Sequence, residues 1–418
     1  MNAIRKLALC LWLPFCCQCA AQIYETNNVI VRTFAGSGFY GYVDGQGTQT
    51  MFYAPSHIVA DAASNLFVLD NANYRIRKIT PDATVSTFVG GGQVNLPAYG
   101  TNASLGSFSF GPMAIDHSNV LWIATGYSPS LLRVSPDGLV SQISLAGISS
   151  VSGIGVDSRN NLFLSDGPGN KIYRYRTNGA LEVFVGSGNP GAVDGNGIFN
   201  SFNFPTALTV DAADNIYVSD SGNDLIRRVN QNRDVVTIAG TRNFQVNLDG
   251  AGTNAGFSAI GAMCADNSGN IIFTVGPSYG GGSAVRKMSP STNVTTIAGN
   301  FSANGYANGA GNQALFSGPI GVCIAQGTIF VVDSGNERIR SLTFDPLAQA
   351  VSPALLSLNT YAGLTITGSV GRAYRIESST NSSNWNPEVT ILLPSSPYLW
   401  IDPEALGQKK FYRAFLLP

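Results

Sequence analysis

The chain is poor in charge, in histidine and in long apolar runs, and each shortage excludes a class of protein. Charged residues make up 12% of the 418 residues, about half the share usual in soluble domains, and the net charge is −1. No strong field therefore draws the whole chain to nucleic acid or to anionic lipid. Two histidines are too few for a zinc site built from several imidazoles. No stretch of the mature chain reaches the roughly 18 to 20 apolar residues of a membrane-spanning helix.

Cysteine is also scarce once the N-terminus is set aside. Four of the six cysteines lie in residues 1–21, where Arg5 and Lys6 precede an apolar run and small residues end the segment. This order is typical of a secretory signal peptide, so we expect residues 1–21 to be removed. The mature protein is then secreted, or lies at the cell surface or in the periplasm. A lipoprotein is the less favoured alternative, because the leader lacks the Leu-small-small pattern before its cysteines.

Glycine, in contrast, is abundant at 47 residues, and an internal repeat organises the chain. Six times, an apolar strand is followed by a polar turn, a second strand such as NLFVLD and a third strand with basic residues such as RIRKI. A fourth strand such as VSTFVG usually follows, which predicts four-stranded antiparallel units. The sixth unit lacks its fourth strand, whereas residues 29–36 read VIVRTFAG. We expect this segment to pair beside the third strand of the last unit, which closes a ring and protects its edges.

Three repeats carry a resemblance to a known family. The stretches NLFVLDNANYRIRKI, NIYVSDSGNDLIRRV and TIFVVDSGNERIRSL, with linking stretches such as DGNGIFNSFNFP, resemble NHL-repeat proteins over about residues 29–345. The resemblance implies an all-β fold, a six-bladed β-propeller of NHL repeats. It leaves the function open, because this repeat serves binding proteins and enzymes alike.

The C-terminal part follows a different pattern. We expect the propeller to occupy residues 22–345, a linker to follow at 346–354, and a small β-sandwich-like domain to form from residues 355–418. Short strands such as AYRIESS and KKFYRAFLL support this last assignment. The stretches GRAYRIESSTNSSNW and FYRAFLLP resemble C-terminal β modules of secreted bacterial proteins.

Polar residues recur at fixed places in the repeat and predict turns. Asp70, Asp220 and Asp333 are expected to hold the turn between the second and third strands by side-chain-to-backbone hydrogen bonds. Aspartates that end the first strand are expected to hold the next turn in the same way: Asp61, Asp116, Asp157, Asp211 and Asp266. One basic residue recurs in each repeat: Arg77, Arg133, Arg174, Arg227, Arg286 and Arg340. We expect these residues to form local ion pairs, and the alternative is that together they form a basic ring for a polyanion.

The first strands alternate between a small face and a large face. The small face includes Gly155, Cys264 and Cys323, and the large face includes Leu208 and Met263. We expect the small residues of one unit to receive the large residues of its neighbour. Cys264 and Cys323 occupy equivalent places on adjacent units, beyond the reach of a disulfide, so buried free thiols are favoured over a bridge.

Five links of about sixteen residues join successive units across one face, and they hold the candidate binding residues. Phe39, Tyr40 and Tyr42 of the first link are candidates for exposed contact with a ligand. The phenylalanines that end the links are expected to fill the gaps between units: Phe52, Phe108, Phe202, Phe257 and Phe316. The link after Gly147 is short, which leaves a notch between the second and third units.

Four links carry Asp-Gly-x-Gly or Asn-Gly-x-Gly, beginning at Asp44, Asp194, Asp249 and Asn308. We favour a turn in which the glycines take positive φ over a calcium site, because the carboxylates are sparse. No cofactor is therefore expected, and calcium is the weak alternative.

Two functions remain open. The favoured hypothesis is a non-catalytic extracellular protein whose looped face holds a protein, peptide or glycan. The alternative is a six-bladed-propeller hydrolase or lyase, lactonase-like and with calcium as a candidate cofactor, which needs Asp44, Asp194 and Asp249 to gather with His57 at the channel mouth. Nucleic-acid binding ranks third, because the chain is not basic and carries an export leader.

Overall fold

The computed structural model describes residues 28–106, 108, 110–126, 129–242, 246–276 and 281–344, and in the C-terminal part residues 355–358, 363–379, 383–394, 398–401 and 411–417. The predicted leader and linker lie outside these residues. The described chain is all-β, with only short 3-10 turns besides its strands. No helix within these residues has the length and apolarity needed to cross a bilayer.

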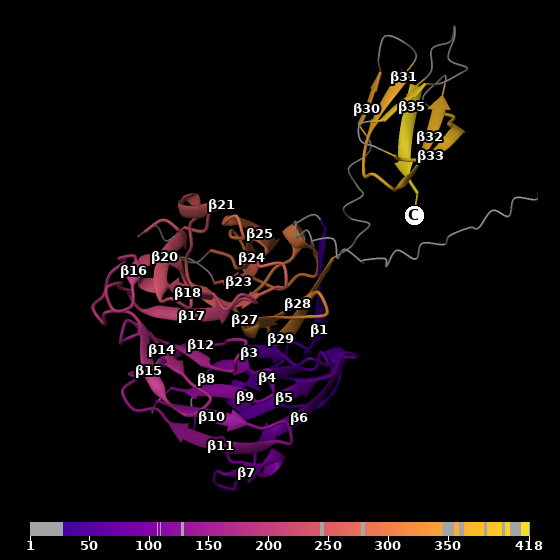
Figure 1. The fold of residues 1–418 in the computed structure, drawn as a ribbon. Coiled ribbons are helices and arrows are strands. Elements are labelled where there is room, and N and C mark those ends of the chain that lie inside the picture. Colours follow the sequence, from indigo (N-terminus) through magenta and orange to yellow (C-terminus); the bar gives the residue numbers. More distant parts are fainter. Residues whose placement is uncertain are drawn as a thin grey trace, which may run out of the picture.

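Between residues 29 and 344 the strands form six antiparallel sheets, numbered here 1 to 6 along the chain (Figure 1). Sheet 1 contains β2 (Gly45–Gln46), β3 (Pro55–Ala60), β4 (Leu66–Asp70), β5 (Arg75–Ile79) and β6 (Thr84–Gly90). Sheet 2 contains β7 (Ala98–Tyr99), β8 (Phe110–Ile115), β9 (Leu121–Thr125), β10 (Ser130–Val134) and β11 (Leu139–Ser144). Sheet 3 contains β12 (Val151–Val156), β13 (Leu162–Asp166), β14 (Lys171–Tyr175) and β15 (Leu181–Val185).

The remaining sheets repeat this order. Sheet 4 contains β16 (Gly195–Asn196), β17 (Pro205–Val210), β18 (Ile216–Asp220), β19 (Leu225–Val229) and β20 (Asp234–Ala239). Sheet 5 contains β21 (Gly250–Ala251), β22 (Ile260–Ala265), β23 (Ile271–Val275), β24 (Ala284–Met288) and β25 (Asn293–Gly299). Sheet 6 contains β26 (Gly309–Ala310), β27 (Pro319–Ala325), β28 (Thr328–Asp333), β29 (Arg338–Phe344) and β1 (Val29–Ala35). Together these strands give a β-propeller-like fold.

Sheet 6 joins the two ends of this region, as the sequence predicts. β1 pairs antiparallel with β29, with Val31 opposite Leu342. The first strands of the sheets also contact one another in order, from β3 through β8, β12, β17 and β22 to β27, and β27 contacts β3. The N-terminal segment thus supplies the fourth strand that the last repeat lacks.

Neighbouring sheets interlock through the predicted small and large faces. A Cβ added to Gly155 would lie 2.6 Å from Cδ1 of Leu208 in the next sheet, so only glycine leaves room for that side chain. Cys323 packs with Ile58, and Ala207 with Met263, in the same sense. Large residues of one sheet therefore enter spaces left by small residues of its neighbour.

Five of the six sheets gain a short fifth strand from the preceding link. β2, β7, β16, β21 and β26 pair with the outermost long strand of their sheets. A 3-10 turn follows each of four of these strands: η1 (Gly47–Gln49), η3 (Gly100–Asn102), η5 (Gly252–Asn254) and η6 (Gly311–Gln313). Sheet 3 has four strands in the described chain, because the preceding link is short. The predicted notch is thus the absence of one edge strand.

Three further 3-10 turns join second to third strands: η2 (Asn71–Asn73), η4 (Ser221–Asn223) and η7 (Ser334–Asn336). Each ends in a residue with left-handed φ: Tyr74, Asp224 and Glu337. These turns lie at the same end of the sheets as the links, because strands alternate in direction.

The C-terminal residues form two three-stranded antiparallel sheets. One contains β30 (Leu355–Leu358), β31 (Gly363–Thr367) and β34 (Tyr398–Ile401), and the other contains β32 (Ala373–Ser379), β33 (Asn386–Leu392) and β35 (Phe411–Leu416). Ile366 of the first sheet shares an apolar cluster with Tyr374 and Ile376 of the second. The two sheets therefore enclose a small core of their own.

Candidate functional site

A fully buried arginine anchors the first link to sheet 1. The Arg77 guanidinium donates to Asp70 at 2.7 Å and to Asp44 at 3.1 Å, and it also donates to the carbonyl oxygens of Val43 and Met51. Charge-assisted bonds of this kind are about twice as strong as neutral ones. Asp44 therefore fixes the path of the link rather than standing free on its surface.

The same cluster recurs in three other sheets. Arg227 donates to Asp194 and to Asp220, each at 2.8 Å, and Arg286 donates to Asp249 at 2.9 Å. In sheet 6 the side-chain acceptors of Arg340 are Asp333 at 2.6 Å and Asn308 at 2.9 Å. The predicted site residues Asp44, Asp194, Asp249 and Asn308 are thus distributed over four sheets, each on its own arginine. Within the described residues, no group of three or more His, Cys, Asp or Glu side chains is arranged to hold a metal ion.

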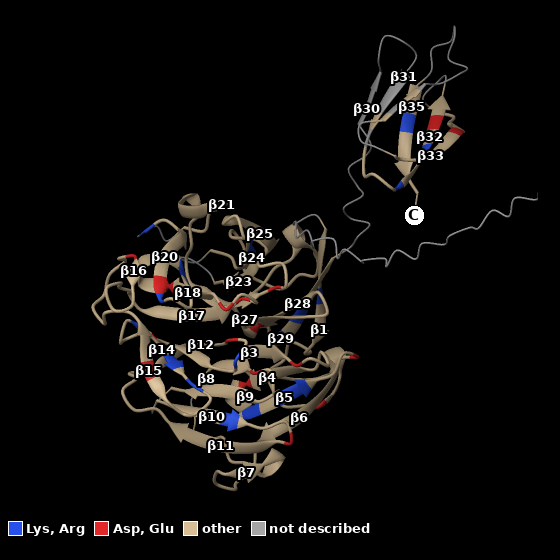
Figure 2. Ribbon diagram, viewed as in Figure 1, with Lys and Arg blue, Asp and Glu red and all other residues tan. Residues whose placement is uncertain are grey.

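The hypothesis of a basic ring is wrong, and the predicted register fails in two sheets. Arg77, Arg227, Arg286 and Arg340 have no exposed area, because they bond within the links. Arg133 and Arg174 lie one position further along their strands than Arg77 does. Arg77 lies opposite Val68, at the centre of the second strand. The residues at the equivalent place are Tyr173, opposite Leu164, and Leu132, opposite Ile123. In sheet 3 the hydroxyl of Tyr173 donates to the Gly147 carbonyl, at the place where four of the other sheets use arginine. Figure 2 shows how few charges the strands carry and the basic residues that lie along β5.

The aspartates at the ends of the second strands do more than hold a local turn. The Asp70 carboxylate accepts the backbone N–H of Tyr53, which precedes the first strand of the same sheet, and the side-chain amide of Asn73. Asp220 and Asp333 accept equivalent bonds. The local side-chain-to-backbone bond that we predicted for this turn is replaced by bonds to Asn, to Arg and to the end of the link. Burial raises the pKa of these three carboxyl groups, and their hydrogen bonds and arginine partners oppose the rise.

The other predicted aspartate turns are confirmed. Asp61 accepts the N–H of Asn65 at 2.8 Å, and the aspartates at 116, 157, 211 and 266 accept backbone N–H groups in the same turn. Four of the five terminal phenylalanines are fully buried between sheets, as expected: Phe52, Phe202, Phe257 and Phe316. Phe108 is partly buried and packs against the apolar cluster between sheets 1 and 2. These residues build the fold and leave the site to other side chains.

The exposed aromatic side chains of the first link are the least constrained of the predicted site residues. Phe39 is 71% exposed and Tyr40 is 73% exposed, and the Tyr40 ring lies 5.4 Å from the ring of Tyr53. Tyr42 is more constrained, because Arg75 stacks on its ring at 3.9 Å and its hydroxyl bonds to Thr87. Phe39, Tyr40 and Tyr53, which we call the aromatic patch, are thus free to contact a ligand.

Sequence reasoning missed Tyr53 as a member of this patch. Tyr53 directly follows the buried Phe52. The equivalent position in the fourth sheet, directly after Phe202, is Asn203. The alternation of buried and exposed residues at the end of the link was the available indication of its exposure.

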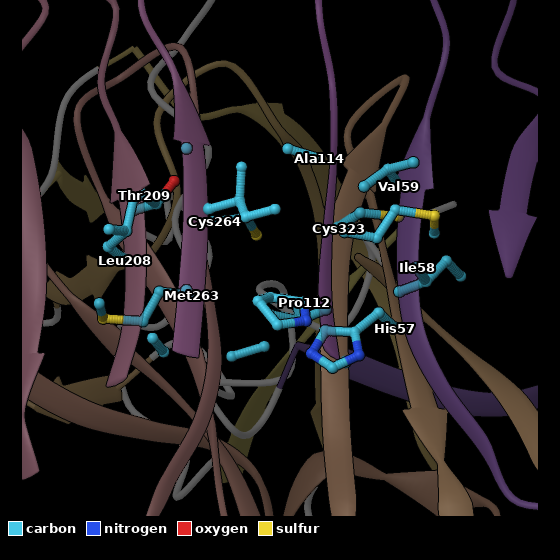
Figure 3. Close-up of a pocket in the computed structure, with 18 of the residues that line it drawn as sticks. His57, Ile58, Val59, Pro112, Ala114, Leu208, Thr209, Met263, Cys264 and Cys323 are labelled. Atoms are coloured by element: carbon cyan, nitrogen blue, oxygen red, sulfur yellow. The ribbon is translucent and has the colours of Figure 1, made fainter. Parts of the chain in front are cut away.

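His57 lies away from the link carboxylates, in a central cavity of about 310 Å³ lined by the first strands of all six sheets (Figure 3). Its Nδ1 is buried and has no hydrogen-bond partner in the described chain. Burial lowers the pKa of His57 to about 4, so the ring is neutral at pH 7. Asp44, Asp194 and Asp249 therefore do not gather around His57 as the enzyme hypothesis requires.

The two cysteines within the described residues line the same cavity. Cys264 and Cys323 are free, as predicted, and burial raises the pKa of each thiol. Thiols held neutral in this way are weak nucleophiles. The lining residues around them include the apolar side chains of Val59, Ala114 and Met263.

Solved structures share this fold at low sequence identity. A protein of unknown function from Bacteroides thetaiotaomicron matches with a TM-score of 0.61 and 17% identity over 76% of each chain. An auxiliary nutrient binding protein from the same organism matches with a TM-score of 0.60 and 16% identity over 76% of each chain. An auxiliary nutrient binding protein from Bacteroides ovatus matches with a TM-score of 0.59 and 17% identity, over 77% of this chain and 78% of its own. No protein-family model and no curated protein matches the sequence. At these identities the likeness concerns the fold alone.

Proposed function

We propose that residues 22–345 form a six-bladed β-propeller of NHL repeats, closed by β1 and exported after loss of residues 1–21. The pairing of β1 with β29 and the contacts of the first strands in order, with β27 against β3, support closure. Residues 355–418 follow as a separate β module after the linker.

Within this fold, we propose a non-catalytic binding function for the looped face, with an extracellular protein, peptide or glycan as the ligand. The observation that carries the proposal is the aromatic patch, whose members Phe39 and Tyr40 are more than 70% exposed. Exposed rings offer large contact area at low cost in side-chain entropy, and they pack on apolar side chains or on sugar rings. Two of the structural neighbours are described as auxiliary nutrient binding proteins, which accords with a binding role.

The anchoring of the links supports this proposal. Asp44 and Asp194 hold their links by bonds to buried arginines, so the exposed rings are presented on ordered backbone. A preorganised surface loses little conformational entropy on binding. The same bonds occupy the carboxylates that a calcium-dependent hydrolase would need, so the binding function is the better supported of the two.

The test is a binding screen of the mature protein against immobilised polysaccharides and secreted-protein extracts, followed by a paired comparison. A Phe39→Ala/Tyr40→Ala variant is expected to lose at least about tenfold in affinity, as hot-spot aromatic residues do. Phe199→Ala is the matched control, because Phe199 is 82% exposed on another link. Equal loss in both variants, or no loss in the first, would contradict a site at the aromatic patch.

A further inference from the structure

The junction between sheets 2 and 3 differs from the other five at its outer edge. In the five sheets with a short edge strand, the valine opposite that strand is at most 1% exposed: Val31, Val85, Val140, Val235 and Val294. In sheet 3 this place belongs to Leu181, which is only half-buried. The missing edge strand thus leaves the junction between sheets 2 and 3 partly open.

A cavity of about 370 Å³ lies in this junction. Trp122 of β9 and Tyr175 of β14 form its aromatic walls, with ring centroids 6.2 Å apart and planes inclined by 60°. Leu162 and Ile143 add apolar surface. The cavity opens at the end of the sheets opposite the links, beside the turn that begins at Asp116, so it is separate from the aromatic patch.

Three charged residues line this cavity, Asp116, Arg133 and Arg176, and Arg176 is paired with Glu182. The Arg133 guanidinium lies 5.9 Å from the Trp122 ring and makes no ion pair within the described residues. Asp116 is already satisfied, since it accepts the N–H groups of Ser118, Val120 and the Trp122 indole. Its carboxylate is therefore not available to Arg133.

The remaining charges near the cavity are also assigned. Glu182 is held by Arg174 and Arg176 and lies 3.8 Å from Arg233, so cations outnumber this carboxylate. Asp137, the other acid near Arg133, is exposed and bonds to Ser135. A hydrogen bond from Ser135 is the main cause that lowers its pKa, and the charge of Arg133 contributes least.

We propose that this cavity is a second binding site, specific for a small planar aromatic carboxylate. The ring of such a ligand packs against Trp122 and Tyr175, and its carboxylate accepts hydrogen bonds from Arg133. Arginine matches the geometry of a carboxylate, and aromatic rings prefer offset or edge-to-face neighbours. The site does not depend on the looped-face function.

The test is fluorine NMR titration of the mature protein with 4-fluorobenzoate and, as the neutral analogue, 4-fluorobenzamide. A ligand of about ten heavy atoms is expected to bind with a dissociation constant on the order of 1 mM. Arg133→Gln should weaken 4-fluorobenzoate about tenfold and leave 4-fluorobenzamide unchanged, since a hydrogen bond to a charged group is lost.

Lys78→Gln is the matched control. Lys78 lies opposite Phe67 on the neighbouring strand, as Arg133 lies opposite Trp122, but its junction is closed. The Lys78→Gln variant should bind both probes as the unaltered protein does. Trp122→Phe should weaken both probes. Absence of saturable broadening at about 10 mM probe, well above the expected constant, would overturn the proposal. So would an Arg133→Gln variant that binds 4-fluorobenzoate with unaltered affinity.

Discussion

All six junctions are formed by equivalent strands of neighbouring sheets. The junction between sheets 2 and 3 is completed in a different way from the other five. In four of those five junctions, a long link descends along the next sheet, adds an edge strand and bonds through Asp or Asn to a buried arginine. At the junction between sheets 2 and 3 the link is short, Tyr173 replaces the arginine, and Leu181 is half-buried. The comparison teaches that the links, as much as the sheets, complete the core.

The largest effect should come from breaking one buried ion pair and its counterpart in sheet 3. Asp220→Ala leaves the Arg227 guanidinium buried without its closest buried partner, which should cost about 3 to 5 kcal/mol of unfolding free energy. Asp166 holds the same place in sheet 3 but accepts only backbone N–H groups, so Asp166→Ala should cost about 1 to 3 kcal/mol. Urea unfolding of both variants measures the difference. Equal losses would mean that the arginine clusters do not strengthen their junctions.

A smaller effect is expected where sheet 6 meets sheet 1. The Glu337 carboxylate accepts the N–H of Ala54 at 2.8 Å across this junction, and Asn170 accepts that of Phe204 between sheets 3 and 4. Glu337→Ala should lower the unfolding free energy by about 1 kcal/mol, whereas Glu337→Gln keeps an acceptor and should lower it less. Thermal unfolding of the two variants separates them. A glutamine variant as unstable as the alanine variant would show that the acceptor is unimportant.

Acidification should weaken sheet 3 on its side toward sheet 4 through Glu182, whose carboxylate lies 3.8 Å from Arg233 of that sheet. Burial acts to raise the pKa of Glu182, but hydrogen bonds and charges of Arg174 and Arg176 hold it below the usual 4.5. A depressed pKa adds stability that is present above pH 4.5 and is lost as the pH falls through the folded-state value. Glu182→Gln should therefore unfold at a lower temperature than the parent at pH 6, and the gap should narrow as the pH falls below 4.5. Melting curves across this range measure the gap, and a gap independent of pH would contradict the assignment.

Calcium should have the smallest effect of all. Asp44, Asp194 and Asp249 already bond to arginines in separate sheets, so no dense set of carboxylates is open to the ion. Millimolar calcium should leave the melting temperature of the mature protein unchanged. A saturable rise that disappears when the three aspartates become asparagine would reinstate the calcium-dependent alternative.

Sequence patterns predicted much of the fold. Short apolar strands bounded by Gly, Asn and Asp gave the antiparallel units, and the unpaired third strand of the last repeat predicted the partner of Val29–Ala35. The alternation of small and large residues predicted that small residues would receive large ones from the neighbouring sheet, and the contact of Leu208 with Gly155 is one example. These features are local or periodic, and so they can be read without coordinates.

The sites were harder to predict, because their bonds join distant segments. Asp44 and Arg77 are separated by 33 positions, and no periodicity relates them. The register error at Arg133 and Arg174 arose because a basic residue shifted by one place resembles its neighbours in sequence but points to the opposite face of the strand. The cavity beside Trp122 depends on an absent edge strand, and the short link indicated only that a notch would exist.

Hydrogen–deuterium exchange of the mature protein tests the central comparison most directly. The outermost strand of sheet 3, β15, has no edge strand within the described residues, whereas β6, β11, β20, β25 and β1 each pair with one. Peptides that cover residues 181–185 should exchange faster than peptides that cover the five other outermost strands, because fewer of their amides are protected. Equal protection in all six strands would contradict the conclusion that the links close five junctions and leave the sixth open.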